Sequence, residues 1–272
     1  MSTLDEPLAL EPVARKQRHA GDLRPLVFDS HFHIIDPRFP LLPNQGYLPP
    51  TFTIADYRAS TASLQVIGGA LVTASFQGFD QRYLIAALLE MGPRFVGVAQ
   101  LPPTVSDAEI LELDEVGVRA VRFNLYRGGA ESLAYLEVMA RRVFELAGWH
   151  VELYIDARDL PDILPLLLSL PRVVIDHLGL AHEGLPSLLK LAEQGNFIKA
   201  TGFGRYDANV PDALQAIYQA NPHALVFGTD LPSTRAPRPF SPEDVTLIQE
   251  ALGPEAAQRV LSVNATRLYK LS

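Results

Sequence analysis

Short apolar segments alternate with amphipathic stretches of helical spacing along most of the chain, and this alternation limits the possible folds more than any other feature. Helical spacing is clearest in residues 81–91, 133–147 and 208–220. Repeated strand–helix units of this kind indicate a parallel sheet with crossover helices. The strands are predicted at residues 26–34, 67–74, 95–100, 119–124, 151–155, 173–176, 197–200 and 225–228.

Eight such units favour a closed (β/α)₈ TIM barrel in the α/β class over an open, doubly wound sheet. No glycine fingerprint follows the first strand, as a dinucleotide-binding sheet would require. A length of 272 residues with 48% hydrophobic content suits one barrel domain. We therefore predict a single domain over residues 26–272, with a closing helix at 255–269, and a loosely ordered leader over residues 1–25.

Composition excludes several kinds of site and partner. The chain has no cysteine, which rules out disulfides and thiolate metal sites. Its net charge of -8 argues against nucleic acid or an anionic membrane as a partner, because both attract basic patches. No apolar run approaches the ~20 residues that span a bilayer, so a cytoplasmic protein is predicted. The sequence leaves the oligomeric state open.

Polar side chains recur at the carboxyl ends of three predicted strands, where TIM barrels carry their active sites. His31 and His33 in VFDSHFHII lie two residues apart and face the same side of the first strand. His177 follows the sixth strand in VVIDHLG, and Asp230 follows the eighth in LVFGTDLP. Taken singly, each could be a core histidine or a turn former, and Asp176 is interpreted as a cap or turn residue. Together the four predict a catalytic ring.

The pattern DSHFH, IDHLG, FGTDLP and a C-terminal NATRLY resembles the amidohydrolase superfamily over the whole barrel. Within its amidohydrolase-related branch, the chain is similar to the 2-pyrone-4,6-dicarboxylate lactonases. This resemblance implies that His31, His33 and His177 polarise an ester carbonyl while Asp230 acts as general base on water.

Cations and hydroxyl or amide groups at other strand ends would suit a small carboxylated substrate. Arginine pairs a carboxylate through a planar fork. For the arginines, a purely structural role is the alternative, and Arg119 and Arg141 are assigned to surface packing. His19, His150, His182 and His223 are assigned solvated or structural roles. The predicted substrate-binding residues are Ser75, Arg122, Asn124, Arg127, Tyr154 and Arg205.

Metal dependence is left with two alternatives. A catalytic zinc takes three protein ligands and a water, which His31, His33, His177 and Asp230 could supply. Metal-dependent members of the superfamily use a further strand-five histidine, or a strand-four carboxylate or lysine. This chain has Tyr154 and Arg122 at those strand ends. The resemblance to the lactonases therefore implies no metal and no other cofactor, with one zinc ion as the alternative.

The predicted function is hydrolysis of a carboxylated lactone ring such as 2-pyrone-4,6-dicarboxylate, with Asp230 as the base. A metal-dependent decarboxylase of the same branch is one alternative. A sugar lactonase is another, since Ser75, Asn124 and Tyr154 could bind hydroxyl groups. A non-catalytic carboxylate-binding barrel is the alternative from a different class.

Overall fold

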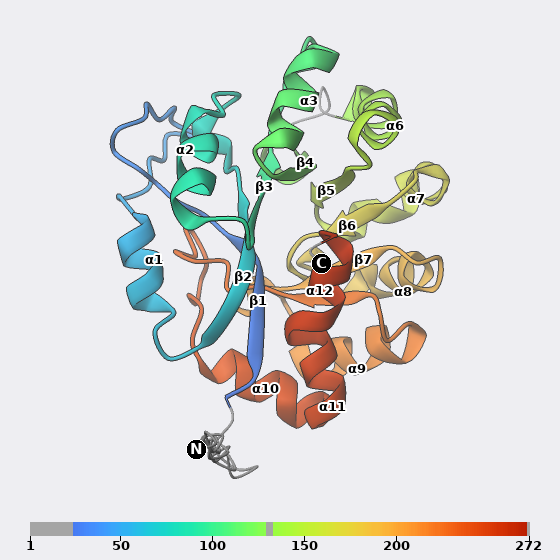
Figure 1. Cartoon of the computed structure of the whole chain (residues 1–272). Helices are drawn as coiled ribbons and strands as arrows, with labels where there is room; N and C mark the ends of the chain where they lie inside the picture. The colour runs from blue at the N-terminus through green and yellow to red at the C-terminus, as the bar shows by residue number, and fades with distance from the viewer. Residues whose placement is uncertain (1–23, 129–132, 271–272) are drawn as a thin grey trace, which may run out of the picture.

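Eight parallel strands form a nearly closed barrel in the computed structural model, which describes residues 24–128 and 133–270 (Figure 1). Each strand pairs with the next in sequence order, which confirms the predicted single-domain TIM barrel. Up to residue 23, the predicted leader lies outside the described residues. The strands are β1 (Leu26–Phe32), β2 (Gln65–Val72), β3 (Phe95–Ala99), β4 (Val118–Asn124), β5 (His150–Tyr154), β6 (Val173–Ile175), β7 (Phe197–Ala200) and β8 (Leu225–Phe227).

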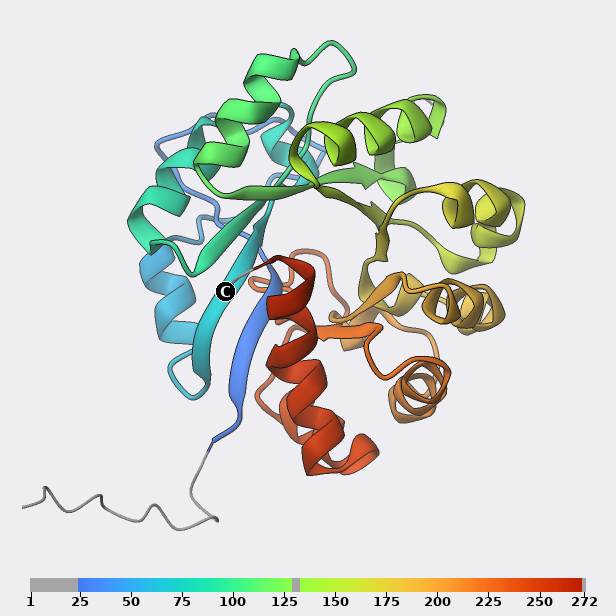
Figure 2. The same ribbon diagram turned by 45° about the vertical axis from the view of Figure 1, so that its right-hand side comes forward.

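Helices surround the strands on the outside of the barrel (Figure 2). Helix α3 begins at a capping box in which the Ser106 hydroxyl accepts from the Glu109 backbone N–H and the Glu109 carboxylate accepts from Ser106, as this sequence pattern predicts. The helices are α1 (Ile54–Ser60), α2 (Arg82–Met91), α3 (Asp107–Glu115), α4 (Leu125–Gly128), α6 (Leu136–Ala147), α7 (Leu160–Ser169), α8 (Leu185–Glu193), α9 (Val210–Ala220), α10 (Glu243–Leu252), α11 (Pro254–Gln258) and α12 (Asn264–Leu268).

The two ends of the sheet meet where β1 and β8 finish. The backbone N–H of Asp230 donates to the His31 carbonyl at 2.7 Å, and that of His33 donates to the Leu231 carbonyl at 2.7 Å. These bonds join the segment after β8 to the end of β1. They therefore hold the first and last predicted catalytic segments side by side.

An apolar cluster fills part of the barrel interior. Phe28, Val72, Val98 and Val226 pack there with Tyr269, which follows α12 and stacks on Phe28 at 5.6 Å between ring centroids. Figures 1 and 2 both show α12 beside β1. Tyr269 therefore packs the segment after α12 against β1 inside the barrel.

The described helices are all shorter than the ~20 residues that span a bilayer. Within residues 24–128 and 133–270, none is both long and apolar enough to cross a membrane.

Candidate active site

A pocket opens at the carboxyl ends of the strands and encloses about 410 Å³ of empty space. Nine of the ten predicted site residues line it, and the tenth, His31, is fully buried beneath it. The predicted site residues therefore meet at one pocket, and their roles stay predictions. The lining residues are His33, Ala74, Ser75, Phe76, Arg122, Asn124, Arg127, Tyr154, His177, Arg205, Asp230, Thr234 and Arg235.

Three imidazoles converge on one carboxylate oxygen in this pocket. The Nε2 atoms of His31 and His33 each lie 3.9 Å from Asp230 Oδ1, and His177 Nε2 lies 3.8 Å from it. Among the described residues, His31 Nε2 and Asp230 Oδ1 are buried without a hydrogen-bond partner. Buried polar atoms are normally paired, so these atoms surround a position suited to a water, a reacting group or an ion.

The side chains of His177 and Asp230 extend from backbone in a rare conformation. His177 has φ = 54° and Asp230 has φ = 59°, the left-handed region that residues other than glycine rarely adopt. Strained backbone of this kind is concentrated at functional sites, where the surrounding structure holds it. The sequence carries no signal for this strain, because both residues follow ordinary strands.

Burial keeps the pocket histidines neutral. It lowers the pKa of His33 and that of His177 well below the usual value, and the neighbouring charges of Arg122 and Arg205 lower them further. The Nδ1–H of His33 donates to the Val72 carbonyl at 2.7 Å, since a carbonyl can only accept. A neutral His33 therefore presents an unprotonated Nε2 to the pocket, so it accepts hydrogen bonds there.

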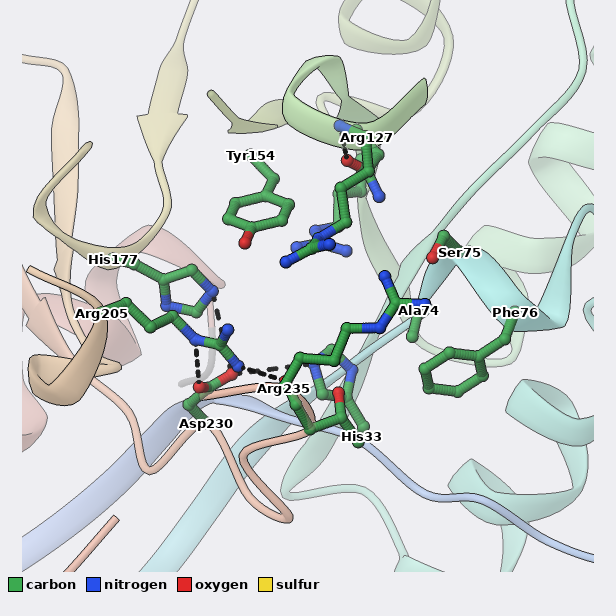
Figure 3. Close-up of a pocket in the computed structure, with 13 residues that line it drawn as sticks. His33, Ala74, Ser75, Phe76, Arg127, Tyr154, His177, Arg205, Asp230 and Arg235 are labelled. Atoms are coloured by element: carbon green, nitrogen blue, oxygen red, sulfur yellow. Dashed lines mark hydrogen bonds and ion pairs between the residues drawn. The ribbon is translucent and has the colours of Figure 1, made fainter. Parts of the chain in front are cut away.

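Asp230 has different surroundings at its two oxygens. Arg205 Nε donates to Oδ2 at 2.8 Å, while the other end of the guanidinium donates to the Thr234 carbonyl at 2.8 Å. Figure 3 shows His33, His177 and Arg205 around Asp230. Arg205 therefore fixes the carboxylate with Oδ1 directed at the histidines and unbonded.

The four pocket arginines divide into two pairs. Arg122 binds Asp176 and Arg205 binds Asp230, each as a buried ion pair. Arg127 and Arg235 have no carboxylate partner within residues 24–128 and 133–270, although both line the pocket. These two guanidiniums are thus available to an anion.

A segment with five prolines, at residues 35–52, reaches the pocket mouth. Arg235 donates to both the side chain and the backbone carbonyl of Asn44 and lies 4.3 Å from the Tyr47 ring centroid. Arg127 Nη1 donates to Gln45 Oε1 at 3.4 Å. The segment is therefore joined to the pocket through the two arginines that lack carboxylate partners.

A charged network beneath the pocket escaped the sequence interpretation. Lys199 from β7 is fully buried and donates to Glu152 Oε2 from β5 at 2.5 Å, and its Nζ lies 3.4 Å from Asp176 Oδ1. Burial alone would raise the pKa of Glu152, but the Lys199 charge lowers it to about 2. A signal was present, because charged residues inside the short apolar segments VELY and FIKA are unusual.

The structure adds two residues, Asp176 and Arg235, to the surroundings of the site. Asp176 is not only a turn former, because it accepts from Arg122 Nε at 3.0 Å and lies 3.3 Å from His31 Nδ1. Arg235 was not singled out, although it follows the eighth strand and lines the pocket. Among the residues left out of the site, Arg119 and Arg141 bind Asp114 and Glu137.

Two buried groups offer the atoms that a metal ion binds. The ligand atoms of His31, His177 and Asp230 lie within 4.8 Å of one another, and so do those of His31, Glu152 and Asp176. Imidazole and carboxylate are ligands that zinc accepts. By residue type and position, the first group could hold a divalent cation in the pocket.

Comparisons with known proteins match almost the whole chain. The family model described as Amidohydrolase matches residues 28–271. A 2-pyrone-4,6-dicarboxylate hydrolase of Comamonas testosteroni is 29% identical, with 89% of each chain covered. A 4-sulfomuconolactone hydrolase of Hydrogenophaga intermedia is 26% identical, with 93% of each covered. A crystal structure of an Agrobacterium tumefaciens protein superposes with a TM-score of 0.81 at 26% identity, covering 93% of this chain and 98% of that one.

Proposed function

The chain belongs to the amidohydrolase family, and on that basis we propose that it hydrolyses the ring ester of a small, negatively charged lactone. The observation that carries this proposal is the convergence of three histidines on Asp230 Oδ1 at the end of an arginine-lined pocket. Two relatives support the choice of substrate, since both are named for hydrolysis of an acidic lactone. A carboxylated lactone such as 2-pyrone-4,6-dicarboxylate is the substrate class we propose.

Substrate binding is assigned to the arginines. Arg127 and Arg235, which have no carboxylate partner in the described part of the chain, would pair with a substrate carboxylate. Arg122, Asn124, Ser75 and Tyr154 line the same pocket and would contact the ring and a second acidic group. This arrangement would hold the ester carbonyl near the three histidines.

Hydrolysis needs a water activated beside that carbonyl. Asp230 Oδ1 would take a proton from the water while the water oxygen bonds to the carbonyl carbon. His33 Nε2, which can only accept, would orient the second hydrogen of the same water. This differs from the sequence interpretation, in which all three histidines polarise the carbonyl.

Collapse of the resulting tetrahedral intermediate would break the bond between the carbonyl carbon and the ring oxygen. His31 and His177 would stabilise the developing negative charge on the carbonyl oxygen. Asp230 would then return its proton to the departing ring oxygen, so one water is consumed and a ring-opened acid is released. The closeness of the three histidines to Asp230 Oδ1 supports this assignment of roles.

A divalent cation is the alternative electrophile. His31, His177 and Asp230 would hold it, and it would polarise the carbonyl and lower the pKa of a bound water. The steps above require no metal, because the histidines and Asp230 supply the same polarisation and base. Arg205 also shares the Asp230 charge, which weakens this carboxylate as a ligand. We therefore propose a metal-independent reaction.

Chelation should leave turnover unchanged. Purified protein would be analysed for bound metals and assayed for hydrolysis of 2-pyrone-4,6-dicarboxylate before and after prolonged treatment with a chelator. We expect less than about 0.1 metal ion per chain at full activity, because the proposed site donates protons and hydrogen bonds without an ion. A neutral sugar lactone, which offers the arginines no anion, serves as the control substrate.

Other results would point elsewhere. One zinc ion per chain, with activity lost on chelation and restored by zinc, would contradict the metal-independent mechanism. Stoichiometric zinc with release of CO₂ from a carboxylated ring and no ester hydrolysis would favour a decarboxylase. Cytoplasmic location and the absence of a nucleic-acid or membrane partner stay predictions of the sequence.

Arg127→Met and Arg235→Met should each raise KM by about 10- to 100-fold while kcat changes by less than about threefold. Each substitution removes a charge-assisted bond to a carboxylate that is the same in ground and transition states, and such a bond contributes roughly 1.5–3 kcal/mol. Steady-state kinetics on the dicarboxylate measure both constants. Arg119→Met is the matched control, since Arg119 binds Asp114 outside the pocket. An unchanged KM in both pocket variants would contradict this assignment.

A further inference from the structure

Lys199 contacts His31 on the side of the imidazole that faces away from the pocket. The Lys199 ammonium donates to His31 Nδ1 at 3.1 Å and to Glu152 Oε2 at 2.5 Å. All three side chains are fully buried. An ammonium group has three donors and no acceptor, so its bond to His31 requires a lone pair on Nδ1.

Asp176 is the other neighbour of His31 Nδ1, and it would favour the opposite proton position. Its Oδ1 atom lies 3.3 Å from Nδ1, yet this oxygen makes no hydrogen bond within the described residues. Asp176 is instead bonded through Oδ2 to Arg122 Nε at 3.0 Å. Lys199 Nζ, at 3.1 Å, lies closer to Nδ1 than Asp176 Oδ1, at 3.3 Å, and an ammonium in that position favours a lone pair on Nδ1.

We propose that Lys199 is a positioning residue that holds His31 in the tautomer with its proton on Nε2, so that His31 donates a hydrogen bond into the pocket and does not ligate a metal. An imidazole that accepts at Nδ1 carries its single proton on Nε2. That Nε2 atom is the buried, unpartnered atom 3.9 Å from Asp230 Oδ1.

His31 and His33 then have opposite tautomers although they lie two residues apart. His33 donates from Nδ1 to the Val72 carbonyl and presents a lone pair. His31 accepts at Nδ1 from Lys199 and presents a proton. The pair can therefore accept from the attacking water with one ring and donate to the carbonyl oxygen with the other. A metal held by His31, His177 and Asp230 would instead need a lone pair on His31 Nε2.

Glu152 sets the position of the lysine. Its Oε1 atom accepts from the Tyr269 hydroxyl at 2.7 Å and lies 3.2 Å from His150 Nε2, while Oε2 accepts from Lys199. The carboxylate is thus bonded at both oxygens and directs the ammonium group toward His31. The chain of contacts runs from the last helix, through the barrel interior, to the reacting centre.

The tautomer can be read directly in the wild-type protein. In protein with ¹⁵N-labelled histidine, two-bond ¹H–¹⁵N correlation spectra distinguish the two neutral tautomers, and the ring signal lost in His31→Asn identifies His31. We expect a protonated Nε2 and an unprotonated Nδ1. Neutron diffraction from a crystal of the wild-type protein gives the same answer without a variant. A proton on Nδ1 would overturn the proposal.

Substitution of Lys199 tests whether this residue sets the tautomer of His31. In Lys199→Met, His31 should shift to the Nδ1-protonated form that donates to Asp176, and zinc should bind at least about tenfold more tightly by calorimetry because Nε2 becomes a free ligand. On 2-pyrone-4,6-dicarboxylate, kcat should fall by about 100-fold with KM within about threefold, as for loss of one donor to a developing oxyanion. Lys190→Met, on the exposed face of α8, is the matched control.

This inference rests on the proposed function only for the role of the donated proton, and the measurements separate the two. An Nε2-protonated His31 in a protein that hydrolyses no acidic lactone would support Lys199 and contradict the proposed function. An active lactone hydrolase in which His31 carries its proton on Nδ1 would support the proposed function and contradict the role of Lys199. An unchanged tautomer in a folded Lys199→Met variant would also overturn the role of Lys199. Should that variant fail to fold, the wild-type spectrum and the neutron density still show whether Nδ1 or Nε2 of His31 carries the proton.

Discussion

Asp230→Asn should lower kcat for hydrolysis of 2-pyrone-4,6-dicarboxylate by about 10³-fold or more, with KM changed by less than about threefold. The amide keeps the shape of the side chain but cannot take a proton from water, and a general base contributes roughly 10²- to 10⁴-fold. Asp230 lies in the pocket wall with its Oδ1 atom unbonded, so binding of the substrate carboxylates by Arg127 and Arg235 should survive. Steady-state kinetics measure the fall in kcat, and a direct measurement of ligand binding checks that the substrate carboxylates still bind.

Folding must be separated from catalysis in that experiment, because Asp230 also pairs with the buried Arg205. Thermal unfolding of the variant would show whether the loss of this pair alters stability. Asp162→Asn, on the exposed first turn of α7, is the matched control and should behave as wild type. Retention of more than about a tenth of the wild-type kcat in a folded Asp230→Asn protein would remove Asp230 from the role of base.

Glu152→Gln should lower the free energy of unfolding by about 3–5 kcal/mol, the cost of removing one partner from a buried ion pair. Glu152 and Lys199 are both fully buried, and the substitution leaves the ammonium with Asp176 as its remaining acidic neighbour at 3.4 Å. The amide also keeps only one acceptor oxygen, whereas the carboxylate uses Oε1 for Tyr269 and His150 and Oε2 for Lys199. Equilibrium unfolding in urea, followed by circular dichroism, measures the change.

An exposed ion pair of similar chemistry supplies the comparison. Glu137 and Arg141 lie four residues apart on α6, with side chains that are 52% and 43% exposed. Glu137→Gln should therefore change the free energy of unfolding by about 0.5 kcal/mol or less, since solvent screens the pair. If Glu152→Gln lowers the free energy of unfolding by less than about 1 kcal/mol, water or a rearranged neighbour must compensate the charge of the buried Lys199.

Most of the fold could be predicted from local patterns. Strands buried on both faces appear as continuous apolar segments, and all eight lie within a few residues of their predicted bounds. The first predicted strand ran to Ile34 and the sixth to Asp176, whereas β1 ends at Phe32 and β6 at Ile175. Hydrophobic pattern does not show where pairing with the next strand stops, because this depends on the neighbour's register.

The part of the pocket that strand ends form could be predicted from the sequence. In a parallel barrel all carboxyl ends lie at one rim, so His33, His177 and Asp230 had to meet once eight units were counted. Arg235 lies on a connection beyond β8, and its place in the pocket depends on the path of that loop and on its contact with Asn44. Loop paths follow from tertiary contacts that no local spacing encodes.

The sequence by itself determined the eight parallel units, the rim at which the pocket opens and most of the residues that line it. The reason is that side-chain alternation and strand direction are local properties of the backbone. Only the tertiary structure decided the partners of those residues: Val72 for His33, Lys199 for His31 and Arg205 for Asp230. Those partners come from segments distant in the sequence. For the two histidines they select the proton positions, since a tautomer depends on the atom opposite each ring nitrogen.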